Sequence, residues 1–213
     1  MLAQECERNQ TFNEEWVNSI THLAGAFFTL IGTYFLVEQA LQFQDQAKLI
    51  SIIIYGASAF VTFLASAVYH GIESGPWKKY LRKIDHASIY VMIAGSYSPI
   101  LLIPLKNDLG FLFFSMLWLL AISGVIWKLF YFNIKQTFSL GSYLLLGWLG
   151  IFHIDAMFAS IPANGLMFML LGGLIYTAGA YFFINDHKKY YHAIWHLFTL
   201  VASALHYTAI MFF

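Results

Sequence analysis

The chain has 213 residues and a formal net charge of zero, with 60% hydrophobic, 19% aromatic and only 10% charged residues. Soluble domains carry roughly 25% charged residues, so this composition predicts a protein that faces lipid over most of its surface. It excludes a disordered chain, a nucleic-acid-binding module with a basic surface and, because Cys6 is the only cysteine, a disulfide-bonded scaffold.

Seven apolar runs follow one another along the chain, and each is long enough to cross a membrane as a helix. A spanning helix needs about 20 residues, and the runs are continuous rather than alternating, which argues against a membrane β-barrel. The connections are short, so we expect one all-α domain over residues 1–213, a seven-transmembrane bundle that follows a polar tail at residues 1–16. The predicted spans are residues 18–38, 49–70, 84–105, 109–130, 140–158, 165–184 and 191–213.

Lysine and arginine are distributed unevenly between the two sides of the predicted bundle. Nine of them lie in the N-terminal tail and the even-numbered loops, whereas the other side has only Lys48 and Lys106. Membrane proteins keep an excess of these residues in the cytoplasm. The bias therefore predicts a cytoplasmic N-terminus and an external C-terminus.

Ionisable residues inside apolar spans are costly, so each one is a candidate functional residue. With the predicted orientation, spans one, two, three and seven each place a histidine or an aspartate near the cytoplasmic side. Four separate segments thus bring imidazoles or a carboxylate to one depth of the membrane. The candidate residues are His22, His70, Asp85, His86, His153, Asp155, His192, His196 and His206.

The pair His192 and His196 has the spacing of two metal ligands, because residues four apart lie on one face of a helix. The intervening residues lack the glutamate of the metalloprotease motif, so that class is not indicated. His70 is a plausible third ligand, and three histidines plus water form the open pattern of catalytic zinc. Asp85 would act as a direct ligand or as a base on the water. Ser66, one turn from His70, could hydrogen-bond the site or a substrate.

The same residues also have simpler interpretations. A histidine pair at a helix start can lie at the interface with its rings reaching the headgroups, and Asp85 can cap the N-terminus of span three. His153 and Asp155 lie near the outer side, as a satisfied polar pair or facing the lumen. His206 lies about 15 Å deeper than His196, too deep to share its metal, so we expect a buried hydrogen-bonded residue or part of an interior polar path.

Five short motifs lie on predicted spans one, two, three, six and seven. They are Glu15-x-x-Asn18-x-x-Thr21-His22-x-x-Gly25; Ser66-Ala-Val-Tyr69-His70; Asp85-His86-x-x-Ile89-Tyr90, continued by Ala94-Gly95-Ser96-Tyr97-Ser98-Pro99; Gly172-Gly173-x-x-Tyr176-x-x-Gly179; and His192-x-x-Trp195-His196. With these motifs in this order, nearly the whole chain resembles the hemolysin III branch of the progestin and adipoQ receptor family.

The resemblance implies a zinc ion held by His70, His192 and His196, with Asp85 holding or activating the zinc-bound water. It also implies a place in the bacterial inner (plasma) membrane, where the charge bias puts the metal site toward the cytoplasmic leaflet. Receptor relatives are credited with lipid-hydrolase activity of ceramidase type, and bacterial members are linked to cell lysis and membrane homeostasis. Compared with the receptors, the chain has a short N-terminal tail and no outer ligand-binding domain, which argues against a hormone-receptor role.

We therefore predict a zinc-dependent hydrolase that acts on amide or ester bonds of membrane lipids and has no nucleic-acid partner. In the alternative hypothesis the protein is a membrane sensor or regulator, in which zinc is structural and Asp85 binds it directly. A pore-forming cytolysin is supported only by the family name. A transporter lacks support because we find no inverted repeat and no sign of a broken helix.

Overall fold

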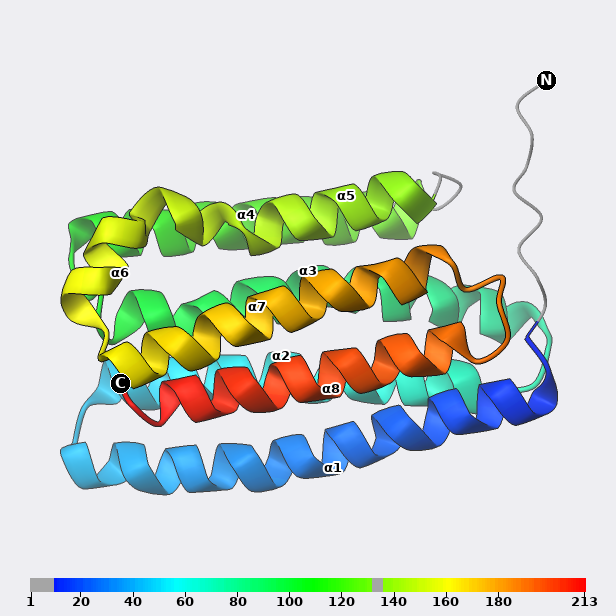
Figure 1. The fold of residues 1–213 in the computed structure, drawn as a ribbon, viewed down its shortest axis with the longest axis horizontal. Coiled ribbons are helices and arrows are strands. Elements are labelled where there is room, and N and C mark those ends of the chain that lie inside the picture. Colours follow the sequence, from blue (N-terminus) through cyan, green and yellow to red (C-terminus); the bar gives the residue numbers. More distant parts are fainter. Residues whose placement is uncertain (1–9, 132–135) are drawn as a thin grey trace.

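In the computed structural model, which describes residues 10–131 and 136–213, long helices run side by side along one axis (Figure 1). These two ranges contain no strand, which confirms the predicted all-α class. The elements are α1 (Phe12–Phe43), α2 (Gln46–Gly71), α3 (Pro76–Leu102), α4 (Asp108–Phe130), α5 (Gln136–Gly147), the 3₁₀ segment η1 (Leu149–His153), α6 (Ile154–Ser160), α7 (Ala163–Ile184) and α8 (Tyr191–Ile210).

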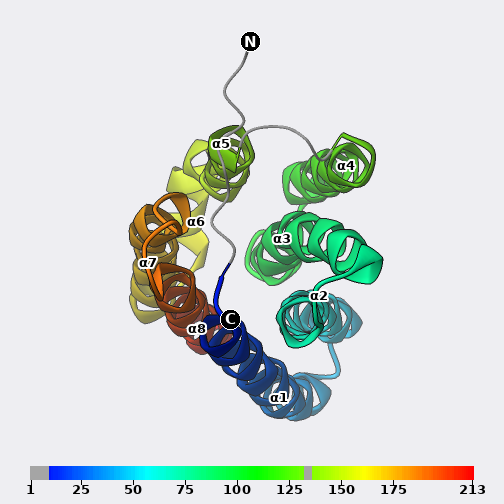
Figure 2. The same cartoon turned by 90° about the vertical axis from the view of Figure 1, so that its right-hand side faces the viewer.

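The helices form a ring when the bundle is viewed along its axis (Figure 2). Six segments of the described ranges are long and apolar enough to cross a membrane, with residues 136–160 counted as one. The seventh crossing is α3, which is more polar and packs against α2, α4, α5 and α8. The start of α1 and the C-terminus lie at opposite ends of the bundle, as an odd number of crossings requires (Figure 1).

The first helix begins inside the predicted polar tail. Thr11 caps α1: its side chain accepts from the backbone of Glu14, and the Glu14 side chain accepts from the backbone of Thr11. This reciprocal arrangement is a capping box, and Thr-x-x-Glu is its sequence signature. Residues 12–16 are therefore helical, so α1 begins within the segment that was expected to be a polar tail.

The third helix also begins earlier than predicted, at Pro76 instead of residue 84. Proline suits the first turn of a helix because its missing N–H would have no partner there. Asp85 therefore lies nine residues after Pro76, inside the helix and far from its N-terminus. The interpretation of Asp85 as an N-terminal cap is wrong for this reason.

The fifth predicted span is interrupted, since α5, η1 and α6 replace one continuous helix over residues 140–158. The backbone groups released by the break need partners, because membrane depth offers no bulk water. Tyr97 of α3 supplies them: its hydroxyl donates to the Gly147 carbonyl at 2.5 Å and accepts from the Gly150 N–H at 2.9 Å. Expecting no broken helix was therefore also incorrect.

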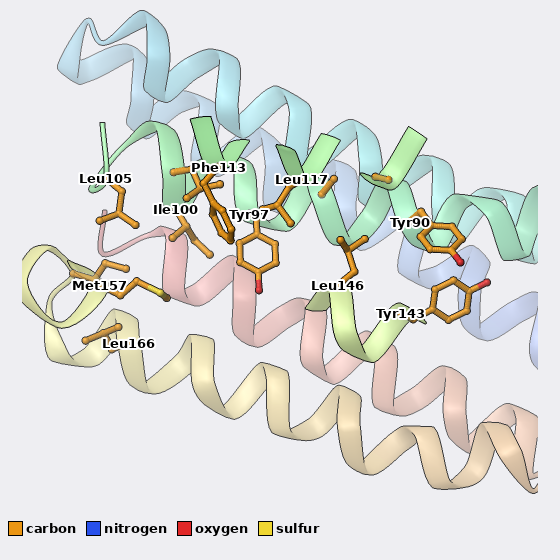
Figure 3. Packing of buried hydrophobic residues seen from close by; sticks show 14 residues of the cluster. Tyr90, Tyr97, Ile100, Leu105, Phe113, Leu117, Tyr143, Leu146, Met157 and Leu166 are labelled. Carbon is orange, nitrogen blue, oxygen red and sulfur yellow. The ribbon is translucent and has the colours of Figure 1, made fainter. Parts of the chain in front are cut away.

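Buried apolar residues hold this broken segment against its neighbours (Figure 3). Tyr97 and Phe113 of α3 and α4 face Leu146 of α5, Met157 of α6 and Leu166 of α7. A second cluster joins α1, α2 and α8. The two clusters fix the helices around an interior space that contains most of the candidate polar residues.

Candidate metal centre

Three histidines from two helices meet near one end of the bundle. His70 lies in the last turn of α2, and His192 and His196 lie in the first two turns of α8. One ligand atom from each residue lies within 4.8 Å of the others. Ring centroids are 5.0 Å apart for His70 and His192, 5.1 Å for His70 and His196, and 4.7 Å for His192 and His196. The three imidazoles can therefore share one metal ion.

Two of these imidazoles use the same ring nitrogen to contact α1. His70 Nδ1 lies 2.6 Å from Glu15 Oε2, and His196 Nδ1 lies 3.2 Å from the Asn18 carbonyl oxygen. An acceptor on one ring nitrogen fixes the orientation of a histidine and leaves the other nitrogen free for a metal. Accordingly, His70 Nε2 is buried and has no hydrogen-bond partner among the described residues.

His192 has an acidic neighbour as well, in the turn between α7 and α8. Its Nδ1 lies 3.9 Å from Asp186 Oδ2. Burial raises the pKa of the Asp186 carboxyl, but contacts with His192 and Gln136 and the charge of Arg82 outweigh this effect, so the pKa is below its ordinary value. The ionised carboxylate therefore faces His192 Nδ1, although 3.9 Å is too long for a hydrogen bond.

The residues present fit a zinc ion. Three imidazoles are ligands that zinc prefers, and a metal would satisfy the buried His70 nitrogen. The interfacial interpretation of the histidine pair is wrong for His196, which is 1% exposed and lies inside the bundle. That the three residues bind a metal stays a prediction, now with a matching geometry.

Asp85 and Ser66 line the same interior space. Asp85 is buried in α3, close to the buried Ser66 side chain of α2. Both line a cavity together with His192 and His196. Asp85 does not belong to the group of three possible ligands. The arrangement thus places a carboxylate near the histidines without adding it to them.

The cavity has a volume of about 330 Å³ and extends well beyond the histidines. Its lining includes Ile100 and Met157, which belong to the apolar core cluster around α3, α4 and α6 (Figure 3). Gly147 and Trp148, at the break after α5, also line it. Most of the lining residues are apolar, so the space suits a hydrocarbon chain better than water.

The chain is similar to known proteins over nearly its whole length. A family model described as "Haemolysin-III related" matches residues 10–207. The "Hemolysin-3 homolog" of Bacillus subtilis (strain 168) is 36% identical over 203 residues, which cover 95% of each chain. The chain belongs to the haemolysin-III-related family. The two further relatives below agree with this assignment.

The similarity extends to named proteins of bacteria and animals. "Hemolysin-3" of Bacillus cereus is 34% identical over 213 residues, covering 100% of this chain and 97% of the relative. The human "Monocyte to macrophage differentiation factor" is 32% identical over 209 residues, covering 94% of this chain and 84% of the relative. With its apolar helices, this haemolysin-III-related protein is an integral membrane protein.

The structure separates the remaining candidate histidines of this family member. His22 lies at the predicted depth and stacks on His196, with ring centroids 3.5 Å apart and an interplanar angle of 9°. Its Nε2 lies 3.1 Å from Thr199 Oγ1, so it borders the three-histidine group without joining it. His86 is buried in α3, and its carbonyl accepts from the Tyr143 hydroxyl at 2.8 Å.

The two deeper histidines lie away from the group, as predicted. His206 lines the cavity and packs against α7 at Gly172, where an added Cβ would come within 2.3 Å of the His206 ring. His153 stacks on Phe113 at 4.2 Å, and both of its nitrogens lack a hydrogen-bond partner among the described residues. The satisfied pair of His153 and Asp155, one of the two alternatives, is therefore not formed.

The sequence interpretation assigned no role to three residues that contact the histidines. Glu15 and Asn18 appear in the first motif, and their spacing with His22 puts all three on one face of α1. The spacing of these three residues could therefore have indicated from the sequence that they belong to one site. Asp186 follows span six in a short polar loop, and nothing local distinguishes it from an ordinary solvated acid.

Proposed function

We propose that this protein is a zinc-dependent hydrolase that cleaves amide or ester bonds of membrane lipids and serves membrane homeostasis. The observation that carries the proposal is the meeting of three histidines, two of them fully buried and one half-buried, with a separate buried carboxylate beside an apolar cavity. Three protein ligands leave a coordination position open, which is typical of catalytic rather than structural zinc.

Each polar residue has a distinct task in this proposal. Zinc, when bound, supplies a Lewis acid and lowers the pKa of a coordinated water to about 7. His70, His192 and His196 would hold it. Asp85 accepts a proton from water in the cavity, and the neighbouring Ser66 hydroxyl would orient the Asp85 carboxylate.

The apolar cavity supports a lipid as the substrate. An acyl chain lying along the cavity would bring its carbonyl to the end lined by Asp85, His192 and His196. Helix α5 makes fewer contacts with its neighbouring helices than α1, α2 and α3 make with theirs. The shape and the polarity of the cavity thus both support a membrane lipid as the partner.

We further propose that the protein lies in the bacterial plasma membrane, with the metal site toward the cytoplasmic leaflet. Lys78, Lys79, Arg82 and Lys83 lie in the first turns of α3, at the same end of the bundle as the histidines. The positive-inside rule supports placing that end in the cytoplasm.

A sensor with structural zinc is the alternative, and it needs a fourth protein ligand. Asp85 was the predicted fourth ligand, but it lies outside the group of residues that can share a metal. This separation favours the hydrolase. Because two relatives are named hemolysin, the experiment below also tests for lysis of membranes.

The test is to purify the protein in detergent, measure its zinc by elemental analysis, and incubate it in vesicles with mixed ceramides and phospholipids. We expect about one zinc per chain, and mass spectrometry should detect free fatty acid that depends on both zinc and Asp85. Full zinc occupancy without any cleavage would favour the sensor. Leakage of a trapped dye without cleavage would favour the lytic alternative.

A further inference from the structure

Helix α1 contributes none of the three possible metal ligands, yet it touches two of them. Glu15 Oε2 lies 2.6 Å from His70 Nδ1 on α2. One turn further along α1, the Asn18 carbonyl lies 3.2 Å from His196 Nδ1 on α8. The ligands come from helices distant in sequence, and α1 is the element that contacts both.

The start of α1 is fastened to both helices independently of these contacts. The Ser19 hydroxyl donates to the Ala67 carbonyl of α2 at 2.8 Å. Glu14 Oε1 accepts from the Tyr190 N–H, just before α8, at 2.8 Å. These bonds determine where Glu15 lies relative to His70, so the short contact between them does not depend on a flexible side chain alone.

Glu15 divides its two carboxylate oxygens between two partners. Oε2 faces His70, and Oε1 lies 2.8 Å from Lys78 Nζ in the first turn of α3. Lys78 also donates to the Ile72 carbonyl at 2.9 Å. Glu15 could therefore anchor the loop between α2 and α3 through Lys78, or act on the metal site through His70.

We propose that Glu15 is a positioning residue of the metal site, which holds the His70 ring so that Nε2 faces the metal and strengthens it as a ligand. This inference rests on the proposed zinc site, but it does not depend on the hydrolase activity. Acceptors behind a ligating histidine typically contribute 10- to 100-fold to metal affinity. The two oxygens of a carboxylate allow Glu15 to serve this role while it also pairs with Lys78.

The test compares metal affinities of purified full-length variants by competition with a chelator. Glu15→Gln keeps the size of the side chain and removes its charge, so we expect zinc affinity to fall roughly 10- to 100-fold. Glu15→Asp should recover part of the loss. Lys78→Met removes the other partner and should leave affinity within about threefold of wild type. Glu38→Gln is the matched control, because Glu38 is exposed near the other end of α1.

A spectroscopic measurement separates positioning from a general loss of structure. We expect the visible absorption bands of bound Co²⁺ to shift in Glu15→Gln and to remain unchanged in Lys78→Met and Glu38→Gln. Thermal unfolding of the metal-free variants checks that each one folds.

The possible failures of this experiment are distinguishable. Wild-type affinity and an unchanged Co²⁺ spectrum in Glu15→Gln would overturn the role of Glu15 and leave the zinc site standing. Equal losses of affinity in Glu15→Gln and Lys78→Met would assign Glu15 to loop anchoring and also overturn the proposal. A wild-type protein that binds no metal would instead refute the zinc site itself.

Discussion

At the scale of single residues, Asp85 shows how burial changes the role that a sequence position suggests. It follows two basic residues and looks like the cap of a helix, but it lies in the third turn of α3 and is buried beside Ser66. A buried carboxylate without a helix end to stabilise needs another reason to be there. Its place in the cavity wall near His192 and His196 supplies one.

Replacing Asp85 by asparagine should separate catalysis from metal binding. The two side chains have nearly the same shape, but an amide does not accept a proton at neutral pH. We expect Asp85→Asn to retain most of its zinc and to lose lipid cleavage at least about 100-fold. Elemental analysis and the vesicle assay measure the two quantities. Loss of zinc as complete as in His196→Ala would make Asp85 a direct ligand and favour the sensor.

Among the three proposed ligands, we expect replacement of His196 to lower the zinc content and the stability of the protein the most. The His196 side chain is fully buried, and its ring stacks on the ring of His22. Its Nδ1 also contacts the Asn18 carbonyl of α1. We expect His196→Ala to lose zinc, and added zinc should no longer raise its melting temperature, because a ligand stabilises only the state that binds it. His187→Ala, which changes an exposed histidine nearby, should retain both properties.

At the scale of elements, the break between α5 and α6 depends on a side chain from another helix. The Tyr97 hydroxyl bonds the Gly147 carbonyl and the Gly150 N–H, and the Trp148 ring nitrogen donates to Thr177 Oγ1 of α7 at 3.0 Å. Polar backbone groups at membrane depth are tolerated when protein partners satisfy them. The interruption lets residues of this segment line the cavity, where a straight helix would turn different side chains inward.

Tyr97→Phe should destabilise this segment without affecting the metal site directly. The substitution leaves the half-buried Gly147 carbonyl and the buried Gly150 N–H without their partner, which costs roughly 1–3 kcal/mol. We expect a lower unfolding midpoint and faster hydrogen exchange at residues 147–151, with unchanged zinc content. Tyr34→Phe changes a tyrosine that is 61% exposed and should match wild type. A Tyr97→Phe protein as stable as wild type would show that the hydroxyl bonds are not needed.

At the scale of the whole molecule, the ring of helices encloses a cavity whose polar end carries all the proposed chemistry. Residues from α1, α2, α3 and α8 meet there, while α5, η1, α6 and α7 complete the apolar part. This division suits a substrate with one polar bond and a long hydrocarbon chain. It also predicts that the polar end faces one side of the membrane only.

Reporter fusions should find the N-terminus in the cytoplasm and the C-terminus outside. The reason is the excess of nine lysines and arginines over two, and the two ends of the described chain lie at opposite ends of the bundle (Figure 1). Alkaline phosphatase is active only outside and green fluorescent protein fluoresces only inside, so a pair of fusions at each end decides the question. The reverse orientation would move the metal site to the outer leaflet.

The class of the protein and the depth of its histidines are determined by the sequence alone. Lipid exposure imposes apolar side chains on every span, so composition and run length show seven crossings without any knowledge of packing. Helical periodicity and the charge bias then place His70, His192 and His196 at one end. The first residue of α1 is also predictable from the sequence, since Thr11 and Glu14 form a recognisable capping box.

The contacts that organise the site were decided only by the tertiary structure. Glu15 and His70 are 55 residues apart, and Asn18 and His196 are 178 apart, so their contacts depend on how each helix is rotated about its axis. That rotation results from side-chain packing between neighbours, which composition does not encode. The break after Gly147 has the same origin, because it is stable only where Tyr97 of another helix satisfies the interrupted backbone.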